Sequence, residues 1–222
     1  DAADIGAHAL SALLKKGWIE RRVREIALTA ATPATAHAPE LNPAQAEAVA
    51  AIQAARDRYQ AFLLDGVTGS GKTEVYLQAI ADCIAQGKQA LIVVPEIGLT
   101  PQLVARFQQR LGHIPALLHS GLNESERLNA WLSARAGDSA VIIGTRSAAW
   151  VPLARPGLFI VDEEHDPSLK QQEGFRYSAR DLLVWRAHRD GVPIVLGSAT
   201  PSLESLHNVQ QRRYEHLSLP ER

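Results

Sequence analysis

Short apolar segments alternate with longer amphipathic ones from residue 42 to the end of the chain. The short segments are rich in valine, isoleucine, leucine and phenylalanine, which is typical of strands buried on both faces. They lie at residues 62–64, 90–94, 116–118, 140–143, 158–161, 193–196 and 214–217. The amphipathic segments, which predict helices, lie at residues 73–86, 101–111, 125–134, 179–190 and 202–210. This alternation predicts an α/β fold with a doubly wound, mostly parallel sheet.

Two of the predicted helices carry end signals. Gly87 follows the helix over 73–86, and glycine accommodates the left-handed conformation that often ends a helix. Asn123 precedes the helix over 125–134, and Glu126 completes a capping-box pattern with it.

The N-terminal part of the chain has a different character. Residues 1–28 contain apolar positions at helical spacing, a glycine at Gly17 and then an extended segment, which predicts the C-terminal part of a winged-helix module. The alternative is a small αβ appendage that only packs on the main domain. Residues 29–41 are alanine, threonine and proline with few other side chains, and we interpret them as a linker.

Composition removes several classes of protein. The 222 residues carry 23 basic and 24 acidic side chains, a formal net charge of −1, which excludes a polybasic protein but allows a local basic groove. Cys83 is the one cysteine, so an internal disulfide or a zinc site of several thiolates is excluded. No apolar run reaches the roughly 18–20 residues of a membrane span, and no signal peptide is visible, so we expect a cytoplasmic protein without a membrane partner. Because the chain begins at Asp1 and lacks methionine, we expect it to be a piece of a longer protein.

Residues 66–73, GVTGSGKT, match the pattern G-x-x-x-x-G-K-[ST] between a predicted strand and a predicted helix. Small residues let backbone N–H groups wrap a phosphate, and the helix N-terminus adds a favourable dipole. Lys72 would contact the β- and γ-phosphates, and the Thr73 hydroxyl would ligate Mg²⁺. The predicted ATP-binding residues of this loop are Gly66, Thr68, Gly69, Ser70, Gly71, Lys72 and Thr73. The alternative is a glycine-rich turn with a surface lysine.

Asp162 and Glu163 follow the predicted strand over 158–161, and ligands of open α/β sheets bind at that end of the strands. Two carboxylates there suit ATP hydrolysis. Asp162 would hold Mg²⁺, and Glu163 would orient and deprotonate the attacking water. Together with Lys72 they are the predicted catalytic residues.

These motifs, with DEEH over 162–165 and GSATPS over 197–202, resemble those of the superfamily 2 helicases. The segments VPEIGLTPQL (94–103), GTRSA (144–148) and 162–181 are similar, more specifically, to the bacterial replication-restart helicases of that superfamily. The resemblance covers residues 42–222 and implies a RecA-like first lobe that binds ATP.

The resemblance also implies site residues. Gln45 corresponds to the family's adenine-reading glutamine, although the segment around it also reads as a helix start. The loops at 95–100 and 144–147 resemble contacts to the backbone of a nucleic acid strand, with Thr100, Arg106, Thr145 and Arg146 as the contacting residues. For the two arginines a surface ion pair is the alternative.

The segment over 166–181 resembles the aromatic-rich loop of related helicases, including the RecQ type. Phe175 and Tyr177 would stack on unpaired bases, and Lys170 and Arg176 would meet phosphates. The alternative for the two aromatic residues is ordinary core packing. The coupling between the acidic box and nucleic acid is expected to pass through His165, Ser198 and Thr200.

The resemblance implies that the longer protein is an ATP-dependent 3′-to-5′ DNA helicase that acts at stalled forks. Its expected partners are single-stranded and forked DNA, single-stranded DNA-binding protein and other primosome proteins, and it would be bacterial and nucleoid-associated. Zinc is expected in the longer protein and not in this chain. A second lobe would supply arginine fingers, which contribute about 10³–10⁵ in rate, so the isolated chain should bind ATP weakly and hydrolyse it very poorly. Another superfamily 2 DNA or RNA translocase and a nucleotide-switched DNA-binding adaptor remain open. For a third alternative, a small-molecule kinase, GSATPS and the loop after DEEH would have no role.

Overall fold

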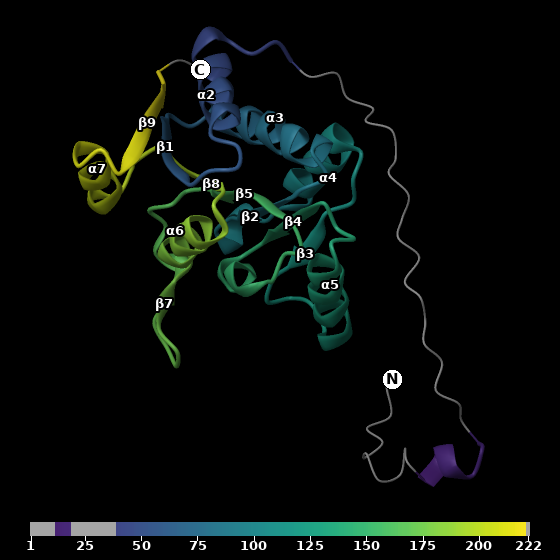
Figure 1. The fold of residues 1–222 in the computed structure, drawn as a ribbon. Helices are drawn as coiled ribbons and strands as arrows, with labels where there is room; N and C mark the ends of the chain where they lie inside the picture. Colours follow the sequence, from purple (N-terminus) through teal and green to yellow (C-terminus); the bar gives the residue numbers. More distant parts are fainter. Residues whose placement is uncertain (1–11, 19–38, 221–222) are drawn as a thin grey trace.

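Residues 39–220 form a parallel β-sheet with helices on both of its faces (Figure 1). The structure is a computed structural model, and it describes residues 12–18 and 39–220. Most of the predicted winged-helix part and of the linker therefore lies outside the described residues. Within the described part of the chain, no helix has both the length and the apolar character of a membrane span.

The sheet has seven strands in the order β3-β4-β2-β5-β8-β1-β9, and every neighbouring pair is parallel. The strands are β1 (Gln60–Gly66), β2 (Gln89–Val93), β3 (Ala116–Leu118), β4 (Val141–Gly144), β5 (Pro156–Val161), β8 (Pro193–Ser198) and β9 (Tyr214–Leu219). The predicted doubly wound parallel sheet is confirmed, and each predicted strand overlaps one of these.

The helices divide between the two faces of the sheet. The α-helices are α2 (Pro43–Ala54), α3 (Lys72–Ala85), α4 (Pro101–Leu111), α5 (Glu124–Ala136), α6 (Ala179–Asp190) and α7 (Leu203–Gln210). Figure 1 shows α2, α3 and α4 on one face and α5 and α6 on the other, with α7 beside the edge strand β9. Three short 3-10 helices, η1 (Glu96–Gly98), η2 (Arg146–Trp150) and η3 (Pro167–Leu169), lie in loops.

Alternate residues of each strand enter two separate cores, because successive side chains point to opposite faces of a sheet. Phe62 and Leu64 of β1 pack in the core beneath α2 and α3, whereas Leu63 packs in the core beneath α6. All three side chains are fully buried. Burial on both faces explains why the strand segments are continuously apolar rather than alternating.

The helix starts follow local side-chain chemistry. Asn42 and Gln45 form a capping box at the start of α2, with Pro43 in the first turn. The predicted capping box of Asn123 and Glu126 is present at the start of α5. These side chains accept backbone N–H groups that the first turn of a helix leaves without partners.

A short antiparallel hairpin interrupts the α/β alternation and was not predicted. Its strands, β6 (Lys170–Gln171) and β7 (Tyr177–Ser178), lie between β5 and α6, and Figure 1 shows the hairpin extending away from the sheet. Its strands are too short to carry a hydrophobic pattern, so no periodicity could reveal it.

Candidate functional site

Three sequence motifs meet at the carboxyl-terminal edge of the sheet. The strands β5, β8 and β1 are neighbours and parallel, so all three end at the same edge. Gly66 ends β1, Val161 ends β5 and Ser198 ends β8. The phosphate loop, the acidic box over 162–165 and the GSATPS segment therefore lie close together although they are far apart in sequence.

The phosphate loop has the backbone that its glycines permit. Gly69 and Gly71 both have φ of 88°, in the left-handed region, and α3 begins at Lys72. A Cβ on Gly71 would come within 2.2 Å of the Gln45 Nε2 atom, so a larger residue would displace that side chain. The loop thus aims the N-terminus of α3 into the cleft, which favours an anionic ligand.

Lys72 is a buried cation whose surroundings leave room for an anion. The side chain is 8% exposed, and its Nζ atom donates to the Gly66 carbonyl at 2.6 Å and lies 3.8 Å from a Glu163 carboxylate oxygen. The cleft in front of it has a volume of about 300 Å³. Its lining residues are Val67, Thr68, Gly69, Gly71, Lys72, Thr73, Arg106, Asp162 and Glu163.

Asp162 accepts a hydrogen bond from a tyrosine that no sequence motif indicated. The Tyr76 hydroxyl donates to the Asp162 Oδ1 atom at 3.0 Å. A Cβ on Gly197 would lie 1.6 Å from that hydroxyl, so the glycine of GSATPS makes room for the contact. Burial raises the pKa of Asp162, and the nearby charge of Glu163 raises it further, against the opposing effects of Tyr76 and Lys72. Burial and the same carboxylates raise the pKa of Tyr76 well above its ordinary value, so it stays a donor.

Glu163 has an unusual backbone for a residue with a side chain. Its φ is 46°, in the left-handed region, where residues other than glycine are uncommon and cost of order 1–3 kcal/mol. The half-exposed carboxylate lies between Lys72 and His165, with the His165 Nδ1 atom 3.7 Å away. Strained conformations of this kind concentrate at active sites.

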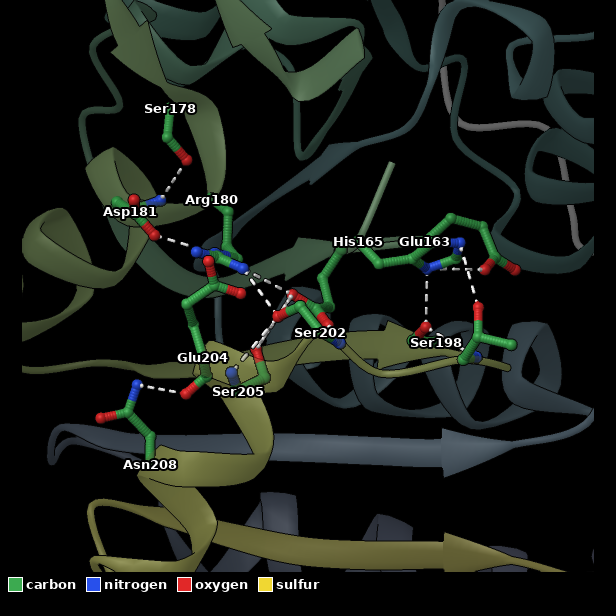
Figure 2. Close-up of polar contacts among 12 residues, drawn as sticks. Glu163, His165, Ser178, Arg180, Asp181, Ser198, Ser202, Glu204, Ser205 and Asn208 are labelled. Carbon is green, nitrogen blue, oxygen red and sulfur yellow. Dashed lines mark hydrogen bonds and ion pairs between the residues drawn. The ribbon is translucent and has the colours of Figure 1, made fainter. Parts of the chain in front are cut away.

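His165 joins the acidic box to the GSATPS segment, as Figure 2 shows. The His165 Nδ1 atom lies 2.7 Å from the Ser198 hydroxyl, and its Nε2 atom lies 3.2 Å from the Thr200 hydroxyl. The three residues predicted to couple these motifs are therefore in contact.

The residues at the cleft fit a nucleotide-bound magnesium ion. The Ser70 hydroxyl of the phosphate loop is buried without a hydrogen-bond partner among the described residues. Thr73 and Asp162, the predicted ligands, both line the cleft and supply oxygens of the kind Mg²⁺ prefers.

Gln45 lies against the phosphate loop and already has two partners. Its Oε1 atom accepts from the Asn42 backbone N–H at 3.0 Å, and its Nε2 atom donates to the Ser70 carbonyl at 2.9 Å. Each amide atom keeps further capacity for adenine, because the oxygen has a second lone pair and the nitrogen a second hydrogen.

Arg106, predicted to contact a nucleic acid strand, lines the nucleotide cleft. It projects from α4, is about half exposed, and has its guanidinium 3.5 Å from Glu74. Glu74 is buried and accepts a bidentate pair from Arg110 at 2.5 and 3.0 Å. Because α4 packs on α3, the helix carries Arg106 toward Lys72. The sequence analysis missed Glu74, which directly follows the phosphate-loop threonine.

Trp150, Phe175 and Tyr177 form an aromatic cluster beside the hairpin. Phe175 is 74% exposed and Trp150 is 43% exposed, whereas Tyr177 is partly buried and packs against the core beneath α6. The centroid of the Trp150 ring is 5.9 Å from that of Phe175 and 5.3 Å from that of Tyr177. Phe175 is therefore not core. Trp150 had no signal in the sequence, because the hairpin that meets it was not predicted.

The remaining predicted strand contacts differ in their exposure. Lys170 and Arg176 are exposed on the hairpin, and Thr100 is exposed while its hydroxyl caps α4. Arg146 donates to the carbonyls of Ser168 and Lys170, both at 3.1 Å, and so holds the hairpin beside η2. Thr145 is 4% exposed, so its side chain is not available to contact a nucleic acid strand.

Comparison with known proteins identifies the family of this chain. A sequence profile of the DEAD/DEAH box helicases matches residues 42–209. The chain belongs to the DEAD/DEAH box helicase family.

Several curated proteins that are similar to this chain carry the same name. "Replication restart protein PriA" of Haemophilus influenzae is 52% identical over 164 residues, which cover 74% of this chain and 22% of that protein. The proteins of that name from Synechocystis and Bacillus subtilis are 44% and 40% identical, covering 100% and 99% of this chain and 27% and 28% of their own length. This DEAD/DEAH box chain thus spans about a quarter of the length of the relatives it matches.

Solved structures agree on the RecA-like fold of the family. RecG bound to a three-way DNA junction matches 82% of this chain and 24% of its own, with a TM-score of 0.57 and 24% identity. The helicase MrfA bound to DNA and AMPPNP matches 81% of this chain and 27% of its own, with a TM-score of 0.58 and 16% identity.

Proposed function

We propose that this chain is the ATP-binding first lobe of an ATP-dependent 3′-to-5′ DNA helicase that acts in replication restart at stalled forks. Its substrates would be ATP with Mg²⁺ and single-stranded or forked DNA. The relatives described as replication restart proteins support this assignment.

One observation carries the proposal: the Lys72 ammonium and the Glu163 carboxylate face each other at 3.8 Å across a cleft that Asp162 also lines. A triphosphate in this cleft would meet the cation and the N-terminus of α3. Glu163 would accept a proton from a water beside the terminal phosphate. Bound Mg²⁺, held by Thr73 and Asp162, would neutralise charge on the phosphates.

Contact with DNA is proposed for the aromatic cluster and its basic neighbours. Exposed rings stack on unpaired bases without reading sequence, and Lys170 and Arg176 would meet phosphates. RecG and MrfA, whose structures have DNA bound, support the same kind of ligand. For Arg106 the cleft location favours a contact with the nucleotide over one with DNA.

The longer protein would supply what this chain does not. We propose a second lobe with arginine fingers, a cysteine-rich zinc region, and contacts to single-stranded DNA-binding protein and other primosome proteins. Such a protein would act in the bacterial cytoplasm, at the nucleoid.

The test is ATP hydrolysis by the whole protein with forked DNA, single-stranded DNA or RNA of matched length. We expect DNA to stimulate hydrolysis and RNA to do so weakly, and Lys72→Ala to abolish it together with tight nucleotide binding. Stimulation by RNA alone would indicate an RNA translocase. Nucleotide binding that changes DNA affinity without turnover would indicate a switched adaptor.

A further inference from the structure

Glu164, the third residue of the acidic box, is completely buried and is not among the residues that line the nucleotide cleft. Its side chain is 0% exposed, so its charge needs compensation from the protein. Four donors reach its carboxylate, from Arg180 Nη1 at 2.9 Å, the Ser202 backbone N–H at 2.7 Å, the Ser202 hydroxyl at 3.0 Å and the Ser205 hydroxyl at 2.9 Å. In Figure 2 the three residues that supply these donors, Arg180, Ser202 and Ser205, lie close together beside the start of α7.

The donors come from two elements that flank the box. Ser202 is the N-cap of α7, so the carboxylate also lies at the favourable end of that helix. Arg180 lies in the first turn of α6, where it also donates to the Ser202 hydroxyl at 2.9 Å and to Asp181 at 2.8 Å. Burial opposes the charge of Arg180, but its hydrogen bonds and the charges of Asp181 and Glu164 outweigh burial and raise its pKa.

The pair of Glu164 and Arg180 closes the base of the segment that holds the hairpin. The segment leaves the box after Glu164, passes through β6 and β7, and returns through Ser178, the N-cap of α6. Arg180 follows two residues later. The hairpin is thus connected to the first turn of α6, and through the Arg180 guanidinium to Glu164.

Glu164 is also fixed to the strand edge and to the strained residue before it. Its backbone N–H donates to the Gly197 carbonyl at 2.9 Å. Glu163 precedes it with φ of 46°, so a small rotation at Glu164 redirects the Glu163 carboxylate. The residues 163, 164 and 165 thus face the cleft, the hairpin base and Ser198, respectively.

We propose that Glu164 and Arg180 are positioning residues that transmit occupancy of the hairpin by single-stranded DNA to Glu163. The inference rests on the proposed function. In this proposal neither residue contacts nucleotide or DNA. When the hairpin moves, the pair changes the orientation of the Glu163 carboxylate.

The test uses the whole protein with Arg180→Gln, measured for ATP hydrolysis with and without single-stranded DNA and for DNA affinity. We expect DNA-stimulated kcat to fall about tenfold, while the DNA-free rate, the KM for ATP and the Kd for DNA change less than about threefold. The matched control is Arg189→Gln on the same helix, which removes the ion pair of a half-exposed guanidinium with Asp190 and should leave stimulation intact.

A double variant separates transmission from loss of folding. Arg180→Gln leaves the Glu164 carboxylate with its serine donors, and Glu164→Gln with Arg180→Gln leaves no buried charge unpaired. We expect the double variant to fold by thermal melting and to stay uncoupled. Stimulation equal to wild type in the double variant, or equal loss of the DNA-free and DNA-stimulated rates in Arg180→Gln, would overturn the inference. Absence of DNA stimulation in the wild type would instead overturn the proposed function, and the inference with it.

Discussion

The nucleotide cleft and the aromatic cluster are built in opposite ways. At the cleft, Lys72 and Asp162 are held by contacts to Gly66 and Tyr76 before any ligand arrives. At the cluster, Phe175 is 74% exposed and is held mainly by neighbouring rings. A triphosphate has one charge distribution, so a preorganised site is advantageous. A DNA strand presents varied bases, and exposed rings accommodate all of them.

The largest effect is expected for Glu163→Gln in the whole protein, which tests the nucleotide cleft. The amide keeps the size of the side chain but cannot accept a proton from water, so hydrolysis should fall about 10²–10⁴-fold. Affinity for a fluorescent ATP analogue should change by less than about threefold. A variant that hydrolyses ATP at the wild-type rate would remove Glu163 from the chemistry.

The cluster is tested by Phe175→Ala. Loss of one stacking ring should cost about 1–3 kcal/mol, or about 5- to 150-fold in Kd for single-stranded DNA, because the ring has little other role. Melting temperature and KM for ATP should be unchanged. Trp185→Ala is the control, since Trp185 is 57% exposed on α6 and belongs to no part of the cluster. Unaltered DNA affinity in Phe175→Ala, by fluorescence anisotropy, would refute the stacking role.

Arg106 tests whether the two regions are separate, since it was predicted to contact DNA and lines the nucleotide cleft. Arg106→Ala should weaken nucleotide binding about five- to tenfold, because a half-exposed charged donor contributes less than a buried one. DNA affinity should stay constant. Arg146→Ala is the reciprocal variant and should weaken DNA binding without changing the KM for ATP. If Arg106→Ala lowers only DNA affinity, its predicted strand contact holds instead.

The smallest effect concerns stability at the cleft. Since burial and Glu163 raise the pKa of Asp162 in the folded chain, the folded state binds its proton more tightly than the unfolded state. Stability therefore falls as pH rises from the ordinary carboxyl pKa through the raised one, and the ionised group is destabilising at neutral pH. Asp162→Asn should raise the melting temperature without nucleotide, with about 2–4 °C expected per kcal/mol. The gain should shrink when the same melts are run below the ordinary carboxyl pKa, and a lower melting temperature at neutral pH would contradict this account.

Much of the fold followed from local patterns. The strands are continuously apolar because both faces of the sheet are covered, and the predicted ranges of α4, β3 and α6 agree with the structure. The hairpin was missed because strands of two residues have no period. The phosphate loop and acidic box were predicted because their chemistry requires certain residues at fixed spacing.

Contacts between distant segments escaped prediction for a different reason. Nothing near Tyr76 in the sequence points to Asp162, since the contact depends on how α3 packs across the sheet and on the space left at Gly197. Glu164 was read only as part of a motif. Its partners Arg180, Ser202 and Ser205 become visible only once α6 packs beside β8 and α7 beside β9.

The sequence by itself determined the parallel sheet, the glycine-rich loop at the start of α3, and the carboxylates after β5, because backbone preference and strand burial are local properties. The tertiary structure alone decided that Arg106 lines the cleft, that Trp150 joins the hairpin rings, and that Glu164 pairs with Arg180 instead of lining the cleft. Those outcomes depend on helix packing and on which charges must find a partner once water is excluded, and no spacing along the chain encodes them.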